Sequence, residues 1–209
     1  MEQCNWILDP DKFLSKQEAV KLLDTASRRA KHAITRKQKV AVRDYFVIDL
    51  ALSTGLRVME IARLNCGDVF LKDNVSSLVV SKGKGGKKRQ VLFNGSFTRH
   101  CKKYFRWKQS IGESIEPGKP LLLSSNTGKH MTERAIQKTF KRCAEKAGIA
   151  LHYSIHSLRH TYACQLYKAS NYNLRLVQKQ LGHSRLSTTE VYADVMRPDL
   201  HKALERLYM

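Results

Sequence analysis

Apolar residues recur at helical intervals through most of this chain. Ser15 and Glu18 have the spacing of a capping box, and the apolar positions that follow repeat as one face of a helix. We therefore predict a helix over residues 16–31. Basic residues dominate the next stretch, and we predict a linker over residues 28–39.

A more apolar helix is predicted over residues 40–53, because Thr54-Gly55 breaks the pattern before a short helix over residues 57–64. Thr132 is a candidate N-cap, and Gly148 and Gly182 stand where helices commonly end. The other predicted helices cover residues 96–110, 132–147, 156–169, 173–181 and short segments from 187 to the chain end.

The period changes from helix to strand between residues 69 and 93. Two short β-type runs, residues 78–80 and 90–93, flank a segment rich in lysine and glycine over residues 82–88. Those glycines suit a hairpin turn. The sequence thus predicts an α+β fold, a mainly helical body with one small antiparallel sheet.

The length of 209 residues suits one domain with its own core. We expect a single domain over residues 1–209, with an N-terminal extension over 1–15 and a C-terminal helix over about 196–209. No apolar run approaches the ~18 residues of a membrane-spanning helix, and no secretory signal is visible. The five cysteines are scattered, which is typical of reduced thiols in a cytosolic protein.

The charge is strongly positive, with 38 Lys and Arg against 18 Asp and Glu and a formal net charge of +20. A surface this basic favours a polyanionic partner, and nucleic acid is the first candidate. One basic run alone is more typical of a solvated face, but several runs together with this net charge favour binding. The runs lie at residues 28–43, 82–89, 99–108 and 138–142.

Arg57 is the first candidate for chemistry. It lies in an otherwise apolar stretch just after a helix break, and a buried guanidinium needs a partner or a ligand. A salt bridge with Glu60, three residues along the same helical face, explains it equally well.

Two histidines and an arginine share the segment from residue 156 to 160. His156 and Arg159 lie one helical turn apart, so both can face one ligand while Leu158 packs inward. Zinc binding by His156 and His160 is disfavoured, because neither the glutamate of a metalloprotease helix nor a third ligand is present at a suitable spacing.

His183 follows an amphipathic run that ends at Gly182, and a helix C-terminus favours a protonated imidazole there. A loop histidine at the surface is the ordinary alternative. Tyr192, taken alone, is more typical of a half-buried core aromatic than of a nucleophile.

Four separated motifs change this assessment when they are taken together. They are Thr54-Gly55-Leu56-Arg57-x-x-Glu60, Gly83-Lys84-Gly85-x-Lys87-x-Arg89, His156-x-Leu158-Arg159-His160, and Leu181-Gly182-His183-Ser184 with Tyr192 nine residues after the histidine. In this order and at these distances they resemble the tyrosine recombinase, or phage integrase, family, near its Xer-type and fimbrial-invertase branches. The resemblance spans roughly residues 16–205.

The resemblance implies a site-specific recombinase that cuts and rejoins DNA without metal, ATP or another cofactor. Arg57 and Arg159 then bind the scissile phosphate, a role that suits their forked donors. Tyr192 is the nucleophile and forms a 3′-phosphotyrosine intermediate. The leaving 5′ oxygen takes a proton from a general acid.

The remaining roles are also implied by the resemblance. His156 assists as an acid or base near the tyrosine, and His183 hydrogen-bonds the phosphate. Glu60 and His160 orient these catalytic residues from behind. Lys84 at the hairpin tip is the expected general acid, with Lys82 as the alternative. Basic residues expected to grip the DNA backbone are Lys82, Lys87, Lys88, Arg89, Lys138, Lys141 and Arg142.

Most members of that family carry a separate DNA-clamping domain before the catalytic one, and we expect it to be absent here. The expected partners are double-stranded DNA, further copies of this chain in a tetramer on paired DNA sites, and accessory DNA-bending proteins. In the tetramer the C-terminal helix is either exchanged between protomers or packed on its own domain. The expected location is cytoplasmic, at the nucleoid, with no membrane role.

Two alternatives remain open from the sequence. A type IB topoisomerase would use the same chemistry to relax supercoils, and a DNA-binding regulator would keep the fold with a vestigial site. The full set of six catalytic candidates argues against the regulator. The sequence does not specify the DNA target or the biological event.

Overall fold

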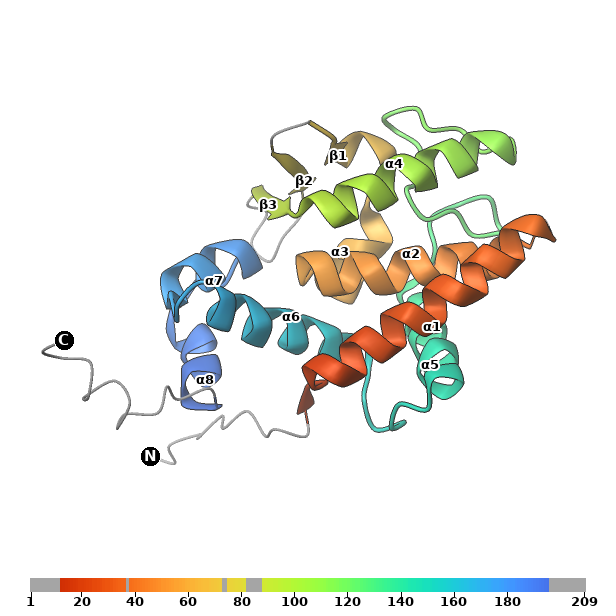
Figure 1. Ribbon diagram of the computed structural model, residues 1–209. Helices are drawn as coiled ribbons and strands as arrows, with labels where there is room; N and C mark the ends of the chain where they lie inside the picture. The colour runs from red at the N-terminus through yellow and green to blue at the C-terminus, as the bar shows by residue number, and fades with distance from the viewer. Residues whose placement is uncertain (1–11, 37, 73–74, 82–87, 196–209) are drawn as a thin grey trace, which may run out of the picture.

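The computed structural model describes residues 12–36, 38–72, 75–81 and 88–195. Helices form most of the body, and a small sheet lies beside the start of α4 (Figure 1). The helices are α1 (Lys16–Thr35), α2 (Lys39–Thr54), α3 (Val58–Arg63), the short 3-10 helix η2 (Cys66–Asp68), α4 (Gly95–Ser110), α5 (Glu133–Ala147), α6 (Ile155–Ala169), α7 (Leu174–Leu181) and α8 (Ser187–Val195). The α+β prediction is confirmed.

The capping box at the start of α1 is present. The Glu18 amide donates to Ser15 Oγ at 3.2 Å, and the Ser15 amide donates to Glu18 Oε2 at 2.8 Å. The predicted linker over residues 28–39 is wrong, because α1 continues to Thr35. Buried Ala30 and Ala33 extend the apolar face by two turns, and packing of that face against α2 outweighs the local charge.

The sheet is antiparallel with strand order β1 (Val69–Phe70), β2 (Ser76–Val80) and β3 (Arg89–Phe93). Leu78 of β2 pairs with Val91 of β3, and both side chains are fully buried. The outer edge of β3 meets α7, where Gln180 accepts from the Leu92 amide at 3.4 Å and donates to the Leu92 carbonyl at 2.6 Å. A side-chain amide thus takes the place of a further strand.

The described buried apolar residues form two clusters. The larger one is shared by α1 to α6 and the sheet, and Phe46 of α2 stacks on Tyr104 of α4 within it. The smaller one joins α6, α7 and α8, and its buried members are Ala163, Cys164, Tyr167, Val177, Leu181 and Tyr192. Tyr192 therefore belongs to a satellite core.

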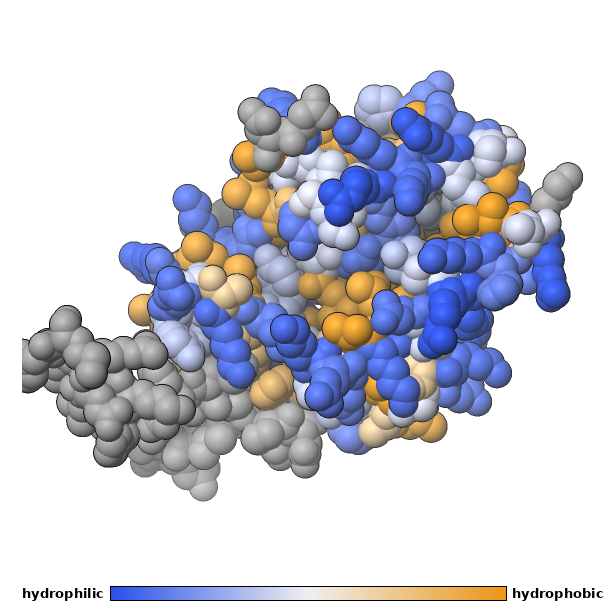
Figure 2. All heavy atoms as spheres, in the orientation of Figure 1, coloured by the Kyte–Doolittle hydropathy of each residue, from blue (hydrophilic) through white to orange (hydrophobic). Residues whose placement is uncertain are grey.

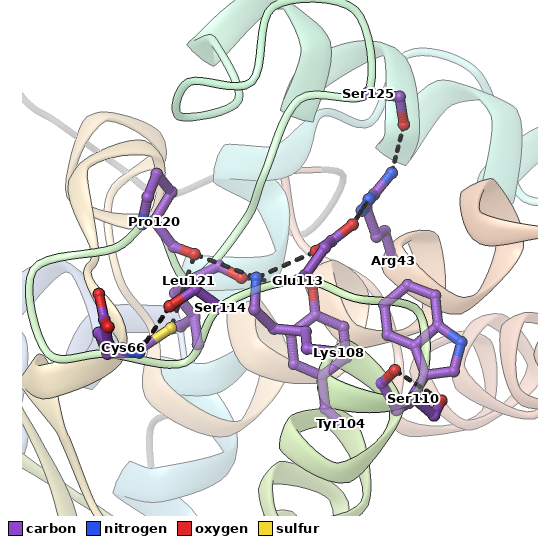
Figure 3. A network of polar contacts seen from close by, with 12 residues as sticks. Arg43, Cys66, Tyr104, Lys108, Ser110, Glu113, Ser114, Pro120, Leu121 and Ser125 are labelled. Atoms are coloured by element: carbon purple, nitrogen blue, oxygen red, sulfur yellow. Dashed lines mark hydrogen bonds and ion pairs between the residues drawn. The ribbon is translucent and has the colours of Figure 1, made fainter.

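The basic run at residues 28–43 also differs from expectation at its end. Arg43 is only 5% exposed and forms an ion pair with Glu113, which also accepts from Lys108 Nζ at 3.1 Å (Figure 3). Lys108 further donates to the Pro120 carbonyl at 3.2 Å. This buried cluster fastens the loop after α4 to α2, so Arg43 and Lys108 are structural rather than part of a DNA-binding surface.

Hydrophilic residues cover most of the described surface on the face shown in Figure 2, and exposed hydrophobic residues form separate patches. Within the described part of the chain, no helix has the length and apolarity to cross a membrane. The cysteines of that part, Cys66, Cys101, Cys143 and Cys164, are all buried and free of disulfides.

Candidate active site

Three of the four sequence motifs converge where α2, α3, α6, α7 and α8 meet near β3 (Figure 1). Gly55 ends α2 in the left-handed conformation at φ +61°, and a Cβ there would lie 2.3 Å from the Tyr162 ring. Only glycine fits both constraints without strain. The turn brings the Gly55 carbonyl and Arg57 toward α6, which carries the third motif.

Arg159 lies at the centre of this site and is only 6% exposed. Its Nη1 donates to the Gly55 carbonyl at 2.5 Å, and its Nη2 donates to the Leu181 carbonyl at 3.0 Å. Burial, with the nearby Arg57 second, lowers the pKa of Arg159 to about 10, so the guanidinium stays charged at neutral pH. One side chain therefore ties the ends of α2 and α7 together.

His183 accepts a hydrogen bond from Arg159, since a guanidinium only donates; its Nε2 lies 2.9 Å from Arg159 Nη2. Its Nδ1 then carries the proton and donates to Thr189 Oγ1 at 3.0 Å. Burial and the neighbouring arginines lower the pKa of His183 to about 3. The expectation of a protonated His183 is wrong, because burial and the arginines outweigh the helix end.

Glu60 is a second centre of the site, with a side chain only 2% exposed. Its carboxylate accepts from Arg89 Nη1 at 2.7 Å and Nη2 at 2.9 Å, from the Arg57 amide at 2.8 Å and from Arg57 Nη1 at 3.3 Å. Burial alone would raise the pKa of Glu60, but the hydrogen bonds from Arg89 and Arg57 lower it below its ordinary value. The Arg57 to Glu60 salt bridge foreseen in the sequence is present, yet the Arg57 side chain remains 26% exposed.

Arg89 was expected to grip DNA phosphates, and the structure instead places it behind the site. Its side chain is 13% exposed, forms a fork with Glu60 and packs against Gly182. A Cβ at Gly182 would lie 2.4 Å from Arg89 Cδ. Arg89 thus joins β3 to α3 and α7. The sequence motifs contain Arg89 but did not show that it pairs with Glu60 within the site.

Tyr192 is 2% exposed, and its hydroxyl lies 3.1 Å from Nδ1 of His160. Burial raises the pKa of Tyr192 to about 12, and the positive charge of Arg159 opposes that rise. Burial and the same arginine lower the pKa of His160 to about 4. At neutral pH both groups are therefore uncharged.

The charges of the site are unbalanced in favour of an anion. Arg57, Arg89 and Arg159 bring three positive charges against the single carboxylate of Glu60 among the described residues. Their surroundings are largely buried, so the field is weakly screened. In the described part of the chain, no three His, Cys, Asp or Glu side chains gather as a metal site would require.

His156 lies on the first turn of α6 and is exposed, and none of the described hydrogen bonds joins it to Tyr192. Burial of part of the ring, with Arg159 second, lowers its pKa below the ordinary value. Lys82, Lys84 and Lys87 lie outside the described residues. Lys88, beside them, is exposed.

The basic stripe expected on α5 is divided in the structure. Lys138 is exposed, but Lys141 donates to the carbonyls of Leu151 and, at 2.8 Å, Tyr153. Arg142 forms a fork with buried Asp44 of α2, at 2.8 and 2.6 Å. Lys141 and Arg142 therefore hold neighbouring segments in place, which makes them poorer candidates for phosphate contacts than Lys138.

Thr189 and Gln178 are site residues that sequence reasoning missed. Thr189 is fully buried and fixes the His183 ring, and Gln178 Nε2 donates to the His183 carbonyl at 3.2 Å. The spacing of Gln178 and His183 around the helix end offered a weak signal for the second contact.

The family model described as "Phage integrase family" matches residues 12–197 of the chain. The chain is 33% identical over 175 residues to tyrosine recombinase XerC of Vibrio campbellii, covering 84% of this chain and 54% of that protein. It is 40% identical over 153 residues to XerC of Neisseria meningitidis, covering 73% and 47% respectively. The chain thus spans about half the length of the curated relatives it matches.

Solved structures with the same fold include the XerH site-specific recombinase bound to a palindromic difH substrate. The TM-score is 0.73 at 24% identity, over 95% of this chain and 54% of that one. A lambda integrase dimer bound to a COC' core site matches with a TM-score of 0.62 at 20% identity, over 90% and 49%. Both likenesses concern the fold of the described helices and sheet.

Proposed function

The chain belongs to the phage integrase family of tyrosine recombinases, and on that premise we propose that it cuts and rejoins double-stranded DNA at specific sites. The observation that carries the proposal is the meeting of three arginines, one carboxylate and the buried Tyr192 around a single point of the fold. The relatives named above are recombinases, and the two solved structures of the same fold are bound to a palindromic difH substrate and to a COC' core site.

The proposed reaction is a transesterification. The Tyr192 oxygen bonds to the scissile phosphorus, the bond from phosphorus to the 5′ oxygen breaks, and a 3′-phosphotyrosine preserves the bond for religation. Arg57 and Arg159 would each donate to non-bridging oxygens, where negative charge develops. Arg159 would keep its hold on the Gly55 carbonyl and turn its second nitrogen toward the phosphate.

Other residues have supporting roles in the proposal. His183 would exchange its hydrogen bond with Arg159 for one with the phosphate. A neutral imidazole can bond a phosphate oxygen only by donating an N–H, so the proton of His183 would move from Nδ1 to Nε2 on binding. His156, exposed beside Arg159, would contact the phosphate or its neighbour. Lys84 would protonate the leaving 5′ oxygen, with Lys82 as the alternative.

We also propose that the arginines and the hairpin lysine supply the charge neutralisation, so that neither metal nor ATP is needed. Lys88 and Lys138, which are exposed, would contact backbone phosphates. Assembly as a tetramer on paired sites, accessory DNA-bending proteins and a nucleoid location in the cytoplasm complete the proposal.

The test uses the full chain and nicked suicide substrates, from which the cleaved strand diffuses away. We expect a covalent protein–DNA adduct on a denaturing gel, unchanged by EDTA and absent for Tyr192→Phe. An adduct that persists in the phenylalanine variant would overturn the nucleophile assignment. No adduct on any substrate, with DNA binding retained, would favour a DNA-binding regulator, and relaxation of supercoils without strand exchange would favour a topoisomerase.

A further inference from the structure

Tyr192 needs a group to receive its proton, and the structure offers one candidate at hydrogen-bonding distance. Among the described hydrogen bonds, the only one to the Tyr192 hydroxyl is with His160 Nδ1, at 3.1 Å. The two rings lie with centroids 5.9 Å apart and planes at 51°, which leaves the hydroxyl directed at the edge of the imidazole. This contact crosses from α8 to α6 within the satellite core.

The electrostatic surroundings keep His160 in the form that accepts a proton. Burial comes first and Arg159 second in lowering its pKa to about 4, so the ring is neutral at physiological pH. The described charged or titratable groups that face the pair come from four segments: Arg57 from the start of α3, Lys12 from the segment before α1, His183 from the end of α7, and His156, Arg159 and Cys164 from α6.

Tyr192 needs such help because burial raises its pKa to about 12. At pH 7 the fraction of free phenolate is then on the order of 10⁻⁵, since each unit between pH and pKa is a factor of ten. Attack by the phenol is efficient only if the proton leaves as the bond to phosphorus forms.

We propose that His160, rather than His156, is the catalytic residue that accepts the Tyr192 proton; this rests on the recombinase function proposed above. The O–H bond of Tyr192 breaks, its proton moves to His160 Nδ1, and its oxygen bonds to phosphorus as the 5′ oxygen leaves with a proton from another donor. His160 starts as the Nε2–H tautomer and becomes an imidazolium. On religation it returns the proton to the departing Tyr192 oxygen.

The bound phosphate makes this transfer feasible. An imidazolium next to Arg159 is unfavourable in the free protein, but a phosphate anion between the two arginines offsets their field. His160 is therefore a weak base without DNA and a stronger one with it. This difference also protects the buried tyrosine from ionising when no substrate is present.

His156 does not occupy an equivalent position. It is exposed, and no described hydrogen bond links it to Tyr192, although it shares a helical turn with Arg159. Its place suits contact with DNA or with the phosphate, whereas the described contact to the Tyr192 hydroxyl is made by His160. Each histidine thus has a distinct expected effect on the reaction.

The experiment measures adduct formation with suicide DNA in which sulfur replaces the bridging 5′ oxygen. A thiolate leaves without protonation, so the rate reports the attack of Tyr192 and not the general acid. The matched variants are His160→Asn, His160→Ala and His156→Gln. Asparagine places an amide oxygen near the position of Nδ1, so it keeps an acceptor for the hydroxyl but cannot take the proton.

We expect His160→Asn and His160→Ala both to slow attack by about 10²- to 10⁴-fold at pH 7. Their rates should rise tenfold per pH unit between pH 6 and 9, while the unmodified chain stays nearly flat over that range. His156→Gln should keep the flat profile. Rescue by asparagine would reduce His160 to a positioning residue, and a sloping profile for His156→Gln would transfer the role to His156; either result overturns the proposal.

Failure of the recombinase function is recognised separately, because the unmodified chain would then form no adduct at all. A second measurement does not depend on the variants folding. Nitrogen NMR of the histidine rings in the unmodified chain should show His160 as the Nε2–H tautomer at pH 7. A ring protonated on Nδ1 would donate to the tyrosine oxygen and would refute the proposal.

Discussion

Replacement of Glu60 by glutamine tests whether this buried carboxylate holds the site together. Four N–H donors from Arg57 and Arg89 converge on its two oxygens. The amide of glutamine offers one acceptor oxygen and directs its own N–H₂ at donors that cannot accept. Arg89, 13% exposed and with its Nε already lacking a described partner, is then left with a charge that no anion balances.

The expected cost in the free energy of unfolding is about 3 kcal/mol. Removal of one partner of a buried ion pair costs roughly 3–5 kcal/mol, and the remaining amide oxygen places this case at the lower end. Because the pKa of Glu60 is lowered in the folded protein, its contribution to the free energy of unfolding is complete above the pKa of an unfolded glutamate. The contribution is lost as the pH falls through the lowered pKa of the folded protein, so the measurement belongs at pH 7.

Urea unfolding followed by circular dichroism measures this cost. With a slope of about 2 kcal/mol/M, the midpoint should fall by about 1.5 M. Glu116→Gln, on an exposed loop, makes the same chemical change and should shift stability by no more than about 0.5 kcal/mol. A loss below about 1 kcal/mol for Glu60→Gln would refute the reasoning, because the arginines would then need no buried anion.

Two further pairs of substitutions test other contacts. Gly182→Ala should lower the free energy of unfolding more than Gly148→Ala. Both glycines have positive φ, but a new Cβ meets Arg89 at 2.4 Å in the first case and only the end of a lysine at 3.4 Å in the second. Equal urea midpoints would show that Arg89 moves freely. Glu113→Gln should lower the free energy of unfolding by about 3–5 kcal/mol, because two buried cations lose their anion (Figure 3). Lys108→Met should lower it by less than about 1.5 kcal/mol. The reverse order of the two variants in thermal unfolding would contradict this account.

Local signals in the sequence were sufficient for most of the fold. The capping box at Ser15 and the glycines after α5 and α7 act within one turn of the chain, so their effects could be predicted without knowledge of the tertiary structure. The end of α1 was missed because its last two turns are held by packing against α2. The prediction gave more weight to the basic residues of this stretch than to its alanines, which recur at helical spacing.

The site was predictable as a set of residues but not as a set of contacts. Arg89 and Glu60 are 29 residues apart in sequence, and nothing local shows that they form a fork. The charge of His183 was misjudged because a helix end contributes only about 0.3–1 kcal/mol, less than the burial and the arginines around the ring. Such effects depend on which distant segments meet.

The satellite core around Tyr192 has a consequence for the cooperativity of unfolding. Among the described residues, six buried apolar side chains form the centre of this core, and Tyr192 is the one that α8 contributes. Segments with few buried contacts open at a fraction of the global free energy. Amide hydrogen exchange should therefore report α8 as a separate unit that opens without the main body, and the contact between Tyr192 and His160 that the proposed reaction needs would be made only while α8 is closed.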